Sequence, residues 1–180
     1  MSNAYYYFVA CLPAISFQEK PLITLDSFLL LCQEQLSYAD YQKINDALFA
    51  EPSEAKVTGG LYGEWIKYNR RFRNEIAFFR AQHANKDPQK YLRGERVLDQ
   101  DIFTALEHAV KAPDPLSAEK ILDQTRGQYL DALTQFHYFD FEVVLSYALK
   151  LQMIERYQRI ESGAGKDVLE EYKNVEIKLS

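Results

Sequence analysis

Residues 61–84, LYGEWIKYNRRFRNEIAFFRAQHA, are the most strongly periodic segment of the chain. Their large apolar residues recur every three or four positions: Leu61, Trp65, Tyr68, Phe72, Ile76 and Phe79. This spacing places them on one face of an α-helix. We therefore predict a single amphipathic helix of roughly 24 residues, which at 1.5 Å per residue reaches about 36 Å. A helix of that length indicates an elongated fold.

A second long helix is predicted over residues 141–161, ending before Gly163 and Gly165. Its first two thirds carry apolar residues on all sides: Val143, Val144, Leu145, Tyr147, Ala148, Leu149, Leu151, Met153 and Ile154. A helix that is apolar all round is buried on several faces. We expect this helix at the centre of a bundle, with the 61–84 helix packed along it.

Shorter helices are predicted from capping residues. Thr24 offers one N-cap, and Ser37 with Asp40 resembles a capping box that opens a helix over 38–49. Further starts are predicted at Asp87-Pro88, Asp99 and Ser117, with Pro113 and Pro115 breaking the chain before the last of these. The aromatic run at residues 5–12 fits either a short strand or the first turns of a helix.

Composition supports an all-α domain. The 180 residues are 47% hydrophobic and 26% charged, and they include only 7 Gly and 6 Pro, too few for a chain rich in β-turns. We predict one elongated helical bundle over 5–180, or two sub-lobes that separate near 50–60, where turn residues cluster. Residues 1–4 are left out of the functional argument, because Ser2-Asn3-Ala4 matches a common protease-cleavage scar.

The charge and the apolar runs indicate the cellular setting. A formal charge of −5 argues against a protein whose main task is binding nucleic acid, since phosphate binding requires a positive field. The longest apolar run, residues 5–15, is too short to span a bilayer and contains Pro13. Two cysteines do not make a disulfide framework. We expect a cytoplasmic protein with neither a signal peptide nor a membrane-inserted helix.

No sequence motif points to catalysis or to a cofactor. His83, His108 and His137 lie far apart and outside metal-ligand spacings. The glycines at 59, 60 and 63 lack the Lys and Ser or Thr of a phosphate-binding loop, and no serine lies in a GxSxG motif. We therefore expect no enzymatic activity, no cofactor and no metal.

The 61–84 helix is basic within an acidic protein. Five cations, Lys67, Arg70, Arg71, Arg73 and Arg80, exceed Glu64 and Glu75 by three charges. Arg73 and Arg80 fall at the edge of the apolar stripe, where three roles remain open: an internal ion pair, which we favour, a contact with a protein partner, or binding of phosphate or nucleic acid. The other side of the helix, with Lys67, Arg70 and Asn74, is predicted to face solvent.

The last predicted helix changes character near its end. Gln152, Glu155, Arg156 and Arg159 continue the line of Phe141, Leu145 and Ala148 but are polar. Either this half leaves the core for solvent, which we favour, or it meets a polar partner surface. With Arg73 and Arg80, these four residues form the predicted partner-binding set.

Several segments together resemble a known family: Tyr6 to Pro13, then Trp65, Tyr68, 73–77 and 80–81, then 149–159. They are similar to an uncharacterised bacterial family of helical proteins encoded beside V/A-type ATPase genes. Such proteins look like short relatives of the central-stalk spacer designated C, or d in eukaryotes. That spacer is helical and seats the central rotor shaft on the membrane ring.

The resemblance implies a mechanical role. The chain would be a non-enzymatic adaptor associated with a V/A-type proton- or sodium-translocating ATPase, with the shaft and the ring as partners and a peripheral position at the cytoplasmic membrane. The alternative is an anion- or nucleic-acid-binding helical module that uses the basic residues at 67–80.

Overall fold

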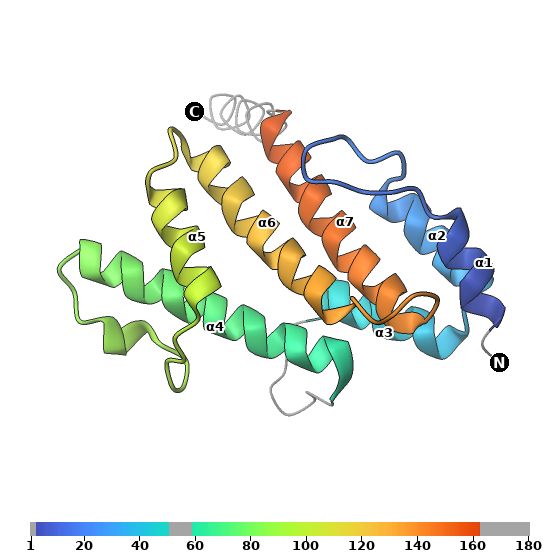
Figure 1. Ribbon diagram of the computed structural model, residues 1–180, viewed down its shortest axis with the longest axis horizontal. Helices are drawn as coiled ribbons and strands as arrows, with labels where there is room; N and C mark the ends of the chain where they lie inside the picture. Colours follow the sequence, from blue (N-terminus) through green and yellow to red (C-terminus); the bar gives the residue numbers. More distant parts are fainter. Residues whose placement is uncertain (1–2, 51–58, 163–180) are drawn as a thin grey trace, which may run out of the picture.

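The computed structural model describes residues 3–50 and 59–162 (Figure 1). Within these ranges the chain forms seven α-helices, one 3-10 turn and no strand, so the predicted all-α class is confirmed. The elements are α1 (Asn3–Cys11), α2 (Leu25–Gln35), α3 (Tyr38–Phe49), α4 (Gly60–His83), the 3-10 turn η2 (Pro88–Tyr91), α5 (Gln100–Val110), α6 (Pro115–Leu133) and α7 (Phe141–Glu161). The aromatic N-terminal run is therefore a helix rather than a strand.

Helix α7 is central, as its all-round apolar pattern predicts. It packs against α1, α2 and α3 on one side and against α6 on the other (Figure 1). All of its residues from Val144 to Leu149 are buried, as are Leu151, Met153 and Ile154. Because several faces of α7 are buried, the shorter helices α1, α2 and α3 are held in place by packing against it and do not need strong amphipathic patterns of their own.

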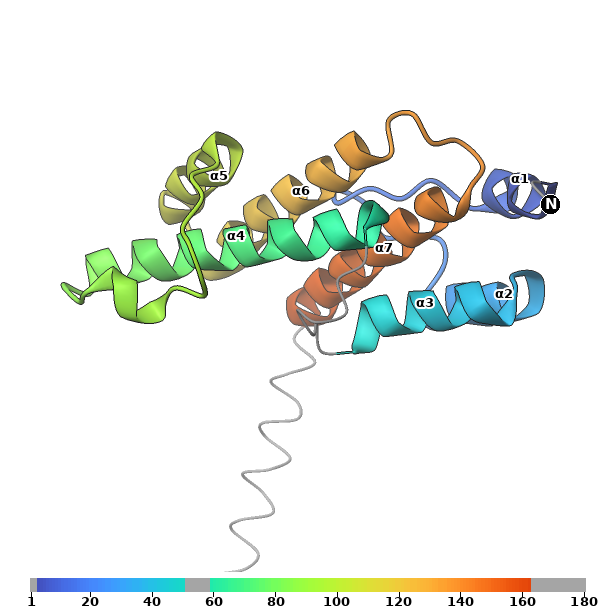
Figure 2. The ribbon, with the colours of Figure 1, turned by 90° about the horizontal axis from the view of Figure 1, so that it is seen from below.

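Helix α4 has the predicted length and buried stripe, but its packing differs from our expectation. Its backbone lies closest to η2 and α5, and it crosses α6 rather than running along α7 (Figure 2). The ring of Tyr68 stacks on Tyr129 of α6, with centroids 3.7 Å apart. Periodicity determines which face of a helix is buried but not which neighbour covers it, and this is why the prediction failed.

Most of the predicted helix starts are confirmed. The side chains of Thr24, Ser37 and Asp99 each accept a hydrogen bond from the backbone N–H of the third residue of α2, α3 and α5, respectively. The predicted start of α6 is wrong. Asp114 is its N-cap, and Pro115 is its first residue rather than a break. Proline is tolerated at the first position of a helix because the N–H that it lacks would have no hydrogen-bond partner within the helix.

Two further expectations concern membranes and segment boundaries. None of the helices in the described ranges combines the length and the apolar character that crossing a bilayer requires. The predicted boundary near 50–60 falls largely on residues 51–58, which lie outside the described residues, as do residues 163–180 of the predicted domain.

Candidate functional site

A groove of about 1080 Å³ lies between four helices. The end of α3 and the first half of α4 form one side, and α6 and the second half of α7 form the other. Its apolar lining comes from residues far apart in sequence: Leu25, Ala47, Leu48, Phe49, Tyr62, Trp65, Ile66, Leu149 and Met153. The groove therefore depends on the complete bundle rather than on one segment.

The groove is strongly basic. Seven cationic residues line it, against two carboxylates, Asp123 and Glu155. The cations are Lys67, Arg70, Arg73, Arg93, Arg126, Arg156 and Arg159. This excess of five positive charges stands in a chain of net charge −5, so the remaining residues carry a formal −10. One surface of the protein thus has a charge opposite to that of the rest.

The structure brings together five of the six residues predicted to bind a partner. Arg73, Gln152, Glu155, Arg156 and Arg159 all line the groove. The sixth, Arg80, is exposed nearer the C-terminal end of α4 and is not part of the lining. The predicted set is therefore largely one surface, formed where α4 faces the end of α7.

Two of these residues have structural tasks inside the groove. The side-chain amide of Gln152 donates to the carbonyl oxygen of Leu48 at 2.9 Å, which ties α7 to the end of α3. Glu155 accepts from the backbone N–H of Leu25 at 2.6 Å, at the first residue of α2. A carboxylate is favourable at a helix N-terminus, whose first N–H groups lack helical partners. The polar residues in the second half of α7 therefore stabilise the bundle as well as line the groove.

An ion-pair network links the groove to the core. The buried carboxylate of Asp123 accepts hydrogen bonds from Arg126 and from Arg156, each at 2.7 Å. The guanidinium of Arg126 also lies 4.3 Å from the centre of the Phe72 ring of α4, a cation–π contact. Burial opposes the charge of Arg156, but the hydrogen bonds and negative charges of Asp123 and Glu119 together outweigh it, so the pKa of Arg156 is raised above its ordinary value. The network therefore joins α4, α6 and α7.

The internal ion pair favoured for Arg73 does not form. Its side chain is exposed, and among the described residues it has no hydrogen-bond or ion-pair partner. The buried ion pair of α4 involves Glu75 instead, which is 2% exposed and accepts two hydrogen bonds of 2.7 Å from Arg96. This interaction raises the pKa of Arg96, although burial acts against it.

Asn74 also differs from the prediction that it faces solvent. It is buried, and its side-chain amide exchanges two hydrogen bonds with the backbone of Arg93, at 3.0 and 3.1 Å. The cause is the segment after α4, which folds back along this side of the helix through η2 (Figure 2). Lys67 and Arg70, on the same predicted face, are exposed as expected.

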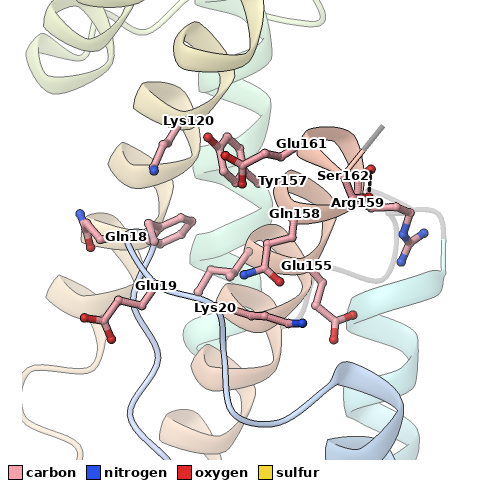
Figure 3. A pocket seen from close by; sticks show the side chains of 12 residues that line it. Gln18, Glu19, Lys20, Lys120, Glu155, Tyr157, Gln158, Arg159, Glu161 and Ser162 are labelled. Atoms are coloured by element: carbon pink, nitrogen blue, oxygen red, sulfur yellow. Dashed lines mark hydrogen bonds between the residues drawn. The ribbon is translucent and has the colours of Figure 1, made fainter. Parts of the chain in front are cut away.

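A second, smaller hollow of about 580 Å³ lies on the other side of the end of α7. Residues 17–20 and Lys120 line it together with the last residues of α7. Figure 3 shows Glu155 and Arg159 projecting from α7 on the side away from Lys120 and Gln18. Its charged residues comprise three cations and three carboxylates, so this hollow has no charge preference comparable to that of the groove.

The cysteines and histidines form no reactive cluster in the described part of the chain. Burial raises the pKa of the Cys32 thiol to about 12, so Cys32 is a protonated core residue at neutral pH. Within residues 3–50 and 59–162, no group of three His, Cys, Asp or Glu side chains is arranged to hold a metal ion.

The C-terminal helices match the sequence model of a protein family. Residues 101–175 match the sequence model of a family described as "Protein of unknown function (DUF2764)". The matched region includes nearly all of α5 and the whole of α6 and α7, with the groove residues Asp123, Arg126 and Arg156. No curated protein sequence matches the chain. No solved structure matches it either.

Proposed function

We propose that this chain is a non-enzymatic interaction protein that binds its partner through the basic groove. The observation that carries the proposal is the gathering of Arg73, Arg156 and Arg159 around an apolar floor. Interfaces combine a desolvated apolar centre with polar and charged residues at the rim, and arginine is enriched there. The groove has this composition, in a position formed by separate helices.

The partner is a V/A-type ATPase, and its shaft and membrane ring are the parts contacted. This part of the proposal rests on the resemblance of three segments to proteins encoded beside such ATPases: residues 6–13, a second segment with Trp65, Tyr68, 73–77 and 80–81, and residues 149–159. Two of these three segments contribute groove residues, among them Trp65, Arg73 and Arg156. The chain would then work on the cytoplasmic side, held peripherally at the membrane by its partners.

Affinity purification from the native host tests this proposal. A tagged wild-type chain should recover shaft or ring proteins of the ATPase, identified by mass spectrometry. The double variant Arg73→Glu/Arg159→Glu should lose them, because it reverses two exposed charges of the groove. Recovery of no ATPase protein with the wild-type chain would refute the association.

An anion- or nucleic-acid-binding module is the second candidate, and the positive groove is the observation that favours it. In this case the wild-type chain should recover nucleic acid that nuclease treatment releases. Binding should also fall steeply as salt rises, because phosphate contacts release counterions.

A further inference from the structure

We infer that the groove takes an acidic amphipathic helix of the partner, with its apolar face on the groove floor and its carboxylates on the surrounding arginines. This inference rests on the proposed function and adds the chemistry of the segment that is bound. It follows from three properties of the groove: its size, its apolar floor and the distribution of its charges.

The size and the walls favour a helix. At about 1080 Å³ the groove exceeds the roughly 300–1,000 Å³ of most small-molecule pockets. Its walls are mainly helices, whose backbone groups are largely hydrogen-bonded within each helix. An extended peptide would find no strand edge to pair with and would leave its own backbone N–H groups unpaired over apolar side chains. A bound helix satisfies its backbone internally and presents side chains at positions i, i+3, i+4 and i+7.

The floor favours a protein segment over a nucleic acid. It is mainly aliphatic, with Leu48, Ile66, Leu149 and Met153 between the helices. Aliphatic side chains offer no ring on which a base can stack, and of the three aromatic residues in the lining, Phe49, Tyr62 and Trp65, only Phe49 is exposed, so successive bases would find a single open ring. The most exposed apolar residue of the lining is Phe49, with 62% of its surface accessible, and a bound apolar face would cover it.

The arginines of the groove favour an acidic segment and fix which of its faces turns toward them. Arg73, Arg93 and Arg159 are exposed, and their side chains have no hydrogen-bond or ion-pair partner among the described residues. Guanidinium groups bind carboxylates through paired hydrogen bonds. The remainder of the chain carries a formal −10, so its net charge disfavours an acidic helix, whereas the groove attracts one.

The chain contains its own reporter, because its single tryptophan, Trp65, lines the groove. The probe is a labelled synthetic helix of about 18 residues, or five turns, with leucines along one face and glutamates beside them. It is compared with a peptide that has Lys in place of each Glu, and with a scrambled peptide of identical composition. The acidic helix should bind in fluorescence anisotropy and change the Trp65 emission, whereas both comparison peptides should bind at least about tenfold more weakly.

Variants then locate the binding. Arg73→Glu/Arg159→Glu should weaken binding of the acidic helix at least about tenfold. The control Lys86→Glu/Lys111→Glu makes the same change of charge at exposed residues outside the groove and should leave binding within about twofold. Phe49→Ala should also weaken binding, and its melting temperature should stay close to that of the wild type because the ring is exposed.

The results separate this inference from the proposed function. Equal affinity for the glutamate and lysine peptides, or equal losses in the two double variants, would overturn the inference. So would displacement of the acidic helix by a single-stranded oligonucleotide that binds more tightly. If the acidic helix binds as expected but purification recovers no ATPase protein, the groove chemistry holds and the ATPase assignment fails. If ATPase proteins are recovered equally with the groove variant, the association holds and this inference fails.

Discussion

Arg156 of α7 donates a hydrogen bond to the buried carboxylate of Asp123 on α6 across 2.7 Å, although half of the arginine side chain is exposed. The same carboxylate holds Arg126, whose guanidinium lies over Phe72 of α4. Asp123 is thus the common partner of two arginines that line the groove. Its charge has both a structural and an electrostatic role, since it fixes these arginines and partly neutralises them.

Replacing Asp123 by alanine should destabilise the fold by about 3–5 kcal/mol, because it leaves Arg126 without a counter-charge in a partly desolvated site. Urea unfolding at neutral pH measures the loss. The control is Asp131→Ala, which removes a 62% exposed partner of Lys150 and should cost less than about 1 kcal/mol. Similar losses for the two variants would contradict a special role for the buried carboxylate.

The stability of the fold should depend on Arg96, which forms the buried ion pair of α4 with Glu75, and hardly at all on Arg73. Arg96→Ala leaves the buried carboxylate of Glu75 unpaired and removes a guanidinium that lies 3.5 Å from the Phe78 ring centre. We expect a loss of about 3 kcal/mol for Arg96→Ala and less than about 0.5 kcal/mol for Arg73→Ala. Thermal and urea unfolding of the two single variants test this. A larger loss at Arg73 would mean that its side chain is not exposed as the structure shows.

The aromatic stripe of α4 gives a prediction for the core. Phe72 is fully buried, next to Tyr68 and beneath Arg126, so Phe72→Ala should cost about 3–5 kcal/mol through lost burial and the cavity left behind. Phe79 is only partly buried and contacts His83. Phe79→Ala should therefore cost clearly less. An equal effect of both substitutions in thermal unfolding would contradict the different burial of the two rings.

The helices and their caps were predictable because their signals are local. The 3.6-residue periodicity of α4, the all-round apolar character of α7 and the caps at Thr24 and Asp99 each lie within a few turns of chain. The neighbours of each helix were not predictable in this way. Arg93 and Arg96, the partners of Asn74 and Glu75, lie 19 and 21 residues further along the chain, and no local pattern indicates that this segment folds back.

The groove was predictable only in part, for the same reason. The basic character of α4 and the polar end of α7 are both evident in the sequence, and the two segments face each other in the structure. Arg93 and Arg126 were missed, because a single arginine in a loop or a helix carries no signal of what it faces. The buried position of Asp123 was missed too, since carboxylates are mostly exposed and only tertiary structure reveals the exceptions.

The link between α1 and α3 predicts a dependence on pH. The phenol of Tyr5 donates to the Asp40 carboxylate at 2.6 Å. Burial alone would raise the pKa of Asp40, but hydrogen bonds from Tyr5, Lys43 and Ser37 outweigh it and hold that pKa below its ordinary 3.8. A carboxyl group whose pKa is lowered by folding stabilises the native state above its unfolded-state pKa. This contribution is lost as the pH falls through the folded-state value.

Tyr5→Phe should therefore lower the free energy of unfolding by about 1.5–3 kcal/mol at pH 7, the usual contribution of a hydrogen bond to a charged group. The loss should stay constant down to about pH 5, well above the ordinary pKa of 3.8, and shrink progressively below that pKa until Asp40 is protonated in the folded state as well. A double-mutant cycle with Asp40→Asn, measured by urea unfolding across this range, isolates the coupling between the two side chains. Tyr38→Phe is the control, because that tyrosine of α3 is 78% exposed and should change stability little at any pH. A coupling of the same size at about pH 2.5 and pH 7 would show that the charge of Asp40 does not contribute to this contact.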